Sequence, residues 1–98
     1  MQIRQTEICA RWFVALRDVR AKARIEARIR RISLGNFGDA KPVGGGVSEL
    51  RVNYGPVYRI YFARRGDDLV LLLNGGDKAR QQGDIARARQ FAASWKDA

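Results

Sequence analysis

The segment that most constrains the fold is ELRVNYGPVYRIYF, residues 49–62, in which apolar and polar residues alternate on either side of NYGP. Because successive side chains of a strand point to opposite faces, this alternation places the apolar residues on one face and the polar residues on the other. The NYGP sequence is typical of a turn. We therefore expect a β-hairpin with one apolar face and one polar face.

The two arms of this hairpin constrain each other's register. A slip by one residue would bury arginines and expose the aromatic residues. One allowed register places Val52 opposite Tyr58, Leu50 opposite Ile60, and the two arginines Arg51 and Arg59 opposite each other. Like charges directly opposite on a sheet are destabilising. Either both arginines extend into water, so that truncating them removes no core packing, or the pair binds an anion.

The charge of the chain favours an acidic partner. The 98 residues fit one domain, residues 1–98, and include 19 Lys and Arg against 10 Asp and Glu, a net charge of +9. The isoelectric point is near 10.8, and a domain value above about 9 is typical of nucleic-acid binding. Arginine outnumbers lysine, and its planar guanidinium suits bidentate phosphate contacts.

Several kinds of site are excluded by composition. Histidine is absent and Cys9 is the single cysteine, which excludes histidine metal sites, multi-cysteine zinc sites, internal disulfides and Ser-His or Cys-His pairs. No P-loop or dinucleotide fingerprint occurs. We expect no metal and no cofactor. Without an apolar run of signal-peptide or membrane-span length, we expect a soluble cytoplasmic protein.

Helix signals dominate the first third of the chain. Gln2–Gln5 is a candidate strand, and Thr6 is a candidate N-cap of a helix that reaches about Arg17. Asp18 is a candidate cap of a second helix, which reaches about Leu34 and stops at glycine. Apolar residues at helical spacing in both segments predict core packing.

The rest of the chain reads as loop, strands and one helix. Gly35–Gly46 is rich in Gly, Pro, Asn and Asp and predicts a loop before the hairpin. The apolar run Asp68–Asn74 predicts a buried strand, and a last helix is expected to begin near Asp84. The order β-α-α-β-β-β-α predicts an α+β fold, a mainly antiparallel sheet covered by helices.

The second helix carries a basic stripe. Its arginines recur every three or four residues, at Arg17, Arg20, Arg24, Arg28 and Arg31. Such a stripe is either a solvated face or a contact surface for RNA or an acidic protein. We take Arg20, Arg24, Arg28 and Arg31 as the candidate RNA-binding residues.

The polar face of the hairpin supplies candidate catalytic residues. Arg51 and Arg59 are candidates to clamp a phosphate, and Tyr61, on the same face, is a candidate to stack on a base or pass a proton. Lys78 is a candidate acid or base. Glu49 either neutralises one arginine or acts as a base, and we favour neutralisation.

Three segments carry a family resemblance: RWFVALRD, GNFGDAKPVGGGVSELRVNYGPVYRIYF and LLLNGGDKARQQGDIARA. Together they resemble the RelE/ParE toxin superfamily, and within it the HigB-like branch of phage-associated addiction module killer proteins. The resemblance covers nearly the whole chain. It implies a toxin of a type II toxin–antitoxin system. The cognate antitoxin would carry a helix-turn-helix domain, and the toxin would bind operator DNA only through this antitoxin.

The resemblance also implies an activity. RelE- and HigB-type members are ribosome-dependent, metal-independent endoribonucleases that cut mRNA, whereas ParE-type members inhibit DNA gyrase without catalysis. Arg59 matches a functional strand arginine of the ribonuclease members, Arg51 matches a recurrent arginine of the ELR motif, and Lys78 lies in the GGDK motif. The last helix lacks the histidine or tyrosine of other members, so the resemblance leaves the proton-transfer group open. A gyrase inhibitor or a basic nucleic-acid-binding protein is the alternative.

Overall fold

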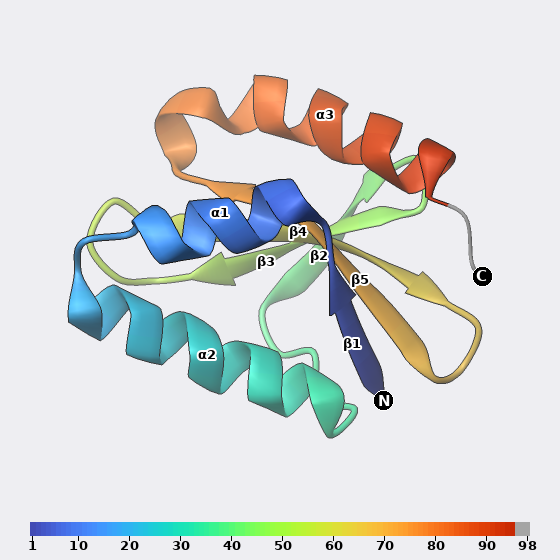
Figure 1. Ribbon diagram of the computed structural model, residues 1–98, viewed down its shortest axis with the longest axis horizontal. Coiled ribbons are helices and arrows are strands. Elements are labelled where there is room, and N and C mark those ends of the chain that lie inside the picture. Colours follow the sequence, from blue (N-terminus) through green and yellow to red (C-terminus); the bar gives the residue numbers. More distant parts are fainter. Residues whose placement is uncertain (96–98) are drawn as a thin grey trace.

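The computed structural model, which describes residues 1–95, has the element order β-α-α-β-β-β-β-α, with a short 3₁₀ helix before the last α-helix (Figure 1). The strands are β1 (Gln2–Gln5), β2 (Ala40–Gly44), β3 (Val47–Val52), β4 (Tyr58–Arg65) and β5 (Leu69–Gly76). The helices are α1 (Glu7–Ala15), α2 (Val19–Ser33), the 3₁₀ helix η1 (Lys78–Arg80) and α3 (Gln81–Ser94). The α+β class expected from the sequence is confirmed.

The five strands form one sheet in the order β1-β5-β4-β3-β2. All neighbours are antiparallel except β1 and β5, which run parallel. Helices α1 and α2 lie on one side of the sheet and α3 lies on the other (Figure 1). Each face of β3, β4 and β5 is therefore covered.

One sequence expectation about the strands is wrong. Residues 35–46 are not loop throughout, because Ala40–Gly44 forms the edge strand β2 against β3, with Ala40 opposite Leu50. Gly44, Gly45 and Gly46 have φ angles of 93°, 63° and 75°, which L side chains rarely adopt. The glycines thus build the β2–β3 turn, and the unpaired edge of β3 provides the hydrogen-bonding partner.

Both predicted helix caps are confirmed. The Thr6 hydroxyl accepts a hydrogen bond from the Cys9 N–H at 3.0 Å, and Asp18 Oδ1 accepts from the N–H groups of Arg20 and Ala21 at 2.9 and 3.2 Å. Each cap satisfies backbone donors that lack a partner within the helix and is typically worth about 1 kcal/mol.

Two helix ends differ from the expected positions. Helix α1 ends at Ala15 rather than near Arg17, because Leu16 is already extended at φ −64° and ψ 127°. Helix α3 begins at Gln81 rather than near Asp84, and η1 leads into it. The earlier start places the first turn of α3 over the sheet, which matters for the site below.

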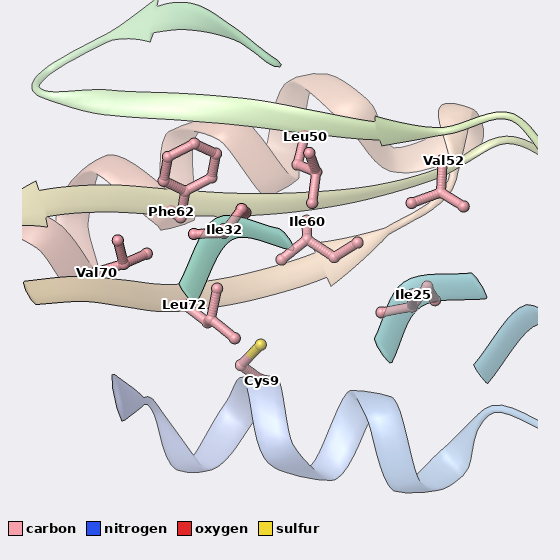
Figure 2. Packing of buried hydrophobic residues seen from close by; sticks show 9 residues of the cluster. All are labelled: Cys9, Ile25, Ile32, Leu50, Val52, Ile60, Phe62, Val70 and Leu72. Carbon is pink, nitrogen blue, oxygen red and sulfur yellow. The ribbon is translucent and has the colours of Figure 1, made fainter. Parts of the chain in front are cut away.

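The core has two parts, one on each face of the sheet. The part beneath α1 and α2 is shown in Figure 2 and consists of Cys9, Ile25, Ile32, Leu50, Val52, Ile60, Phe62, Val70 and Leu72. The part beneath α3 consists of Val47, Tyr61, Ala63, Leu71, Leu73, Ala88 and Ala92. Alternate residues of β3, β4 and β5 thus enter opposite cores.

Within residues 1–95, no helix combines the length and the apolar character that crossing a bilayer requires.

Candidate functional site

Three of the four candidate catalytic residues come to one end of the sheet. Arg51 of β3 pairs with Arg59 of β4, as the hairpin register predicted, and Arg59 pairs in turn with Gly76 of β5. Lys78 follows Gly76 by two residues and lies exposed in η1. We call the three paired residues Arg51, Arg59 and Gly76 the row. Because neighbouring strands are about 4.8 Å apart, Arg51 and Gly76, its outer members, are separated by about 10 Å.

Arg59 does not extend into water, which corrects the sequence expectation. Its side chain is 7% exposed, because α3 covers this face of the sheet. The Arg59 Nε lies 3.5 Å from Oε1 of Glu49, whose side chain is 1% exposed. The two atoms form an ion pair without hydrogen-bond alignment. The neutralising role favoured for Glu49 is confirmed, and truncation of Arg59 would leave a buried charge unpaired.

Two further contacts hold this ion pair in place. Gln81, in the first turn of α3, donates from Nε2 to Glu49 Oε2 at 2.9 Å. Arg59 donates from Nη1 to the carbonyl oxygen of Val57 at 3.0 Å. Val57 has a φ of 60°, the only non-glycine residue with a positive φ among residues 1–95. A β-branched residue in this region is strained, and the strained turn presents its carbonyl to Arg59.

Tyr61 is buried beneath α3, which corrects a second expectation. Its ring is fully covered, so it cannot stack on a base in this conformation, and its hydroxyl has no hydrogen-bond partner in the described chain. Burial raises the pKa of Tyr61 above its ordinary value; Glu49 and Asp84 raise it further, and Arg59 opposes them. The raised pKa makes loss of the phenol proton harder.

Arg51 is the accessible arginine of the hairpin pair. Its side chain is 41% exposed, and its Nε lies 3.3 Å from Asp39 Oδ2. The carbonyl oxygen of Arg51 accepts a hydrogen bond of 2.7 Å from Nη1 of Arg28 on α2. This bond joins the basic stripe to the row of cations at the end of the sheet.

The other stripe arginines are less restrained than Arg28. Arg20, Arg24 and Arg31 are exposed on α2, whereas Arg28 is half-buried. The guanidinium carbon of Arg24 lies 4.8 Å from the centre of the Tyr54 ring in the β3–β4 turn, within the range of a cation–π contact. The stripe and the turn therefore present cations and an aromatic ring on one continuous surface.

A cleft of about 480 Å³ opens beside the site. Its apolar wall comes from α1, the β3–β4 turn and the start of β4, and its polar wall comes from the end of β5, η1 and α3. The lining residues are Ile8, Trp12, Leu16, Pro56, Tyr58, Asn74, Gly75, Gly76, Asp77, Arg80, Asp84 and Arg87. None of these residues was among the sequence candidates, because no motif links α1 to the segment after β5.

The polar wall of this cleft is built around Asn74 and Asp84. The Asn74 amide donates from Nδ2 to the backbone carbonyl of Asp84 at 3.0 Å, and both side chains are more than nine-tenths buried. Burial raises the pKa of the Asp84 carboxyl, with Asp77 adding to the shift and Arg87 and Arg80 opposing it. A polar residue at the end of an otherwise apolar strand was the one available sequence signal.

Two glycines make this packing possible. A Cβ on Gly76 would collide with Oδ2 of Asp84, and a Cβ on Gly75 would collide with the ring of Trp12. The GG of the GGDK segment is therefore required by close approach of side chains from α3 and α1, rather than by an unusual φ angle.

A second hollow lies between α1 and α2, and Trp12 lines both it and the cleft. This apolar groove has a volume of about 560 Å³ and is lined mainly by aliphatic and aromatic side chains, with Glu26 and Arg30 at its rim.

For metal binding, no group of three or more His, Cys, Asp and Glu side chains gathers within the part of the chain that the structure describes.

The family model described as "Phage derived protein Gp49-like (DUF891)" matches residues 11–92. A Haemophilus influenzae protein described as "Uncharacterized protein" is 46% identical over 92 residues, which are 94% of this chain and 93% of the relative. No solved structure matches the chain significantly. The chain therefore belongs to the Gp49-like family of phage-derived proteins, a toxin-like addiction-module family.

Proposed function

We propose that the protein is the toxin of a type II toxin–antitoxin system and that it cuts mRNA on the ribosome without a metal ion. The observation that carries the proposal is the row Arg51–Arg59–Gly76, which brings Arg51 and Lys78 to the same end of the sheet. Membership of the Gp49-like family supports the toxin–antitoxin part of the proposal, and mRNA cleavage is what the resemblance to ribonuclease toxins implies.

In the proposed reaction the 2′-hydroxyl of the RNA gives its proton to water and attacks the adjacent phosphate, and the bond from that phosphate to the 5′-oxygen of the next nucleotide breaks. Negative charge builds on the phosphate in the transition state, and fixed cations stabilise that charge. Arg51 and Lys78 are the accessible cations for this role, and Lys78 is also the candidate acid for the leaving group. Arg59 does not bind the phosphate in this proposal, because its guanidinium is buried and its charge is neutralised by Glu49.

The stripe on α2 supplies RNA affinity in this proposal. Arg20, Arg24 and Arg31 are exposed, and Arg28 links their helix to Arg51. Cations along one surface bind the RNA backbone by releasing counterions, independently of sequence. The RNA would then cross from α2 to the end of the sheet.

The apolar groove between α1 and α2 supports an antitoxin partner. A groove of about 560 Å³ flanked by a basic helix suits an amphipathic helix with acidic residues at its edges. The family points to such a partner. A groove site on the α1–α2 face would leave the row on the α3 face uncovered, so we expect inhibition through blocked access to the α2 stripe.

One observation favours a second function, inhibition of DNA gyrase without catalysis. Two of the candidate proton-transfer groups are buried, since Glu49 is 1% exposed and Tyr61 is 0% exposed. A protein that only binds needs the basic surface but no matched acid and base. The two functions predict different targets and can be separated directly.

The test uses programmed ribosomes and a gyrase supercoiling assay in parallel. The proposal is supported if cleavage of A-site mRNA falls about a hundred- to thousandfold in Arg51→Ala and in Lys78→Ala. Both variants should still unfold cooperatively, with stability changed by at most about 1 kcal/mol. Arg64→Ala is the matched control, since Arg64 is an exposed strand arginine outside the row. Loss of supercoiling without any mRNA cleavage would establish gyrase inhibition instead.

A further inference from the structure

The cleft beside the row contains chemistry that phosphate binding does not use. The rings of Trp12 and Tyr58 meet edge to face with centroids 6.3 Å apart, and both line the cleft. The volume of about 480 Å³ falls in the range of about 300–1,000 Å³ typical of small-molecule sites. The apolar wall is thus suited to a planar ring.

The polar wall has two acceptors without donors. Asn74 Oδ1 and Asp84 Oδ2 are buried and make no hydrogen bond with any described residue. The orientation of the Asn74 amide is fixed, because its nitrogen must face the Asp84 carbonyl that it donates to. A buried acceptor without a donor costs free energy that an incoming N–H group would recover. This wall therefore selects for a donor.

The rim adds positive charge to the same wall. Arg80 and Arg87 line the cleft, are exposed, and lie close enough to Asp84 to act on its carboxyl. Arginine binds phosphate through paired hydrogen bonds. A ligand that satisfies all three features is planar, carries an amino group and bears a phosphate.

We propose that the cleft is a nucleotide-binding site that takes a base with an exocyclic amino group. The base lies against Trp12 and Tyr58, the amino group donates to Asn74 and Asp84, and the phosphate lies at Arg80 and Arg87. A carbonyl in place of the amino group would face two acceptors and be rejected. The inference rests on the proposed function, because it identifies the kind of nucleotide held beside the phosphate site.

Two pairs of mononucleotides test this selection, since each pair differs in an amino group against a carbonyl. The pairs are CMP with UMP and AMP with IMP. Titrations are followed in ¹H–¹⁵N spectra through the indole N–H of Trp12, which Trp95→Phe distinguishes from the second tryptophan. We expect CMP and AMP to bind at least about tenfold more tightly than UMP and IMP, as a hydrogen bond to a charged acceptor implies.

Variants show which residues cause the preference for an amino group and which bind the phosphate. Asp84→Asn can turn an N–H group toward the ligand, so the preference for CMP over UMP should fall toward one. Arg80→Gln and Arg87→Gln should weaken CMP and UMP by the same factor and leave cytidine binding unchanged. Arg4→Gln removes an equal charge from exposed β1 outside the cleft and should leave both affinities as in the unmodified chain.

The outcomes separate this inference from the proposed function. Equal binding within both nucleotide pairs, or a response that does not include Trp12, overturns the nucleotide site even if ribosomal mRNA is cut normally. A clear preference for CMP and AMP without any mRNA cleavage keeps the nucleotide site and overturns the proposed function. The nucleotide pairs are compared on the unmodified protein, so their result does not depend on whether Asp84→Asn folds.

Discussion

Arg59 and Glu49 form a buried ion pair beneath the first turn of α3, with Nε and Oε1 3.5 Å apart and side chains 7% and 1% exposed. Both charges are removed from water, and Gln81 closes the pair on the side of the helix. Such a pair is sensitive to the loss of one partner, because the remaining charge is then buried alone. The stability of this end of the sheet therefore depends on the buried pair, whereas the proposed chemistry depends on the accessible Arg51 and Lys78.

The first prediction concerns the stability of this pair. Arg59→Ala should lower the free energy of unfolding by about 3–5 kcal/mol and the Tm by more than about 10 °C, because Glu49 loses its counter-charge. The double variant Arg59→Met with Glu49→Gln should recover most of the loss. Arg51→Ala is the matched control and should change stability by at most about 1 kcal/mol, as its pair with Asp39 is partly exposed. Thermal and urea unfolding measure all three, and an unchanged Tm in Arg59→Ala would contradict the buried pair.

The second prediction concerns the strained turn. Val57 adopts a φ of 60°, which glycine tolerates without cost. Val57→Gly should therefore stabilise the fold by up to about 1 kcal/mol, because it relieves the strain at this position. The greater freedom of glycine in the unfolded chain offsets part of that gain. Asn53→Gly, in the same turn, is the control and should be neutral or destabilising. A lower Tm for Val57→Gly would show that the turn is not strained.

The third prediction concerns the basic stripe. Replacing Arg20, Arg24 and Arg31 with Gln should reduce the slope of log affinity against log salt for single-stranded RNA by about 2, at about 0.7 per lost contact. Arg28 is left in place because it supports the Arg51 carbonyl. The matched control replaces Arg4, Lys41 and Arg64, which are exposed elsewhere, and lowers the net charge equally. Identical slopes for the two triple variants would assign the stripe to solvent or to the antitoxin.

The fourth prediction concerns metal ions. Under the proposed function, protein treated with EDTA and then desalted should cut mRNA on intact ribosomes at its original rate, because the chain offers no histidine and a single cysteine as ligands. Activity is measured in magnesium buffer, which keeps the ribosomes assembled, with untreated toxin as the control. Activity that returns only after zinc or manganese is added would defeat the metal-free mechanism.

Local sequence signals predicted much of the fold. The alternation in β3 and β4 and the opposition of Arg51 and Arg59 follow from period-two patterning, and the caps at Thr6 and Asp18 follow from side chains that satisfy neighbouring N–H groups. These features depend on residues close in sequence. Strand β2 was not predictable in this way, because its Gly- and Pro-rich sequence forms a strand only where β3 offers an unpaired edge.

The candidate site was less predictable because alternation gives a face but not what covers it. Arg59 and Tyr61 share the face expected of them, yet α3 covers that face, so both are buried. The cleft is lined by both Trp12 of α1 and Asp84 of α3, two distant segments that no local pattern brings together. Burial of polar residues on a strand is thus decided by tertiary packing.

The last prediction concerns the pH dependence of stability through Asp84. Burial raises the pKa of its carboxyl above the ordinary value in the folded protein, so the folded state binds this proton more readily than the unfolded state. Such a group contributes stability that is fully present below the unfolded pKa of about 3.9 and is lost as the pH rises through the folded pKa. At neutral pH the unmodified protein therefore holds a buried carboxylate at a cost in stability, and Asp84→Asn avoids that cost.

The Tm of Asp84→Asn relative to the unmodified protein should be higher at pH 7 than at pH 4. Asp67→Asn, which removes an exposed carboxylate from the β4–β5 turn, is the control for the change in net charge. Calorimetric unfolding at both pH values measures the difference, and a Tm gap that stays constant between pH 4 and pH 7 would show that the Asp84 carboxylate is not destabilised by its burial.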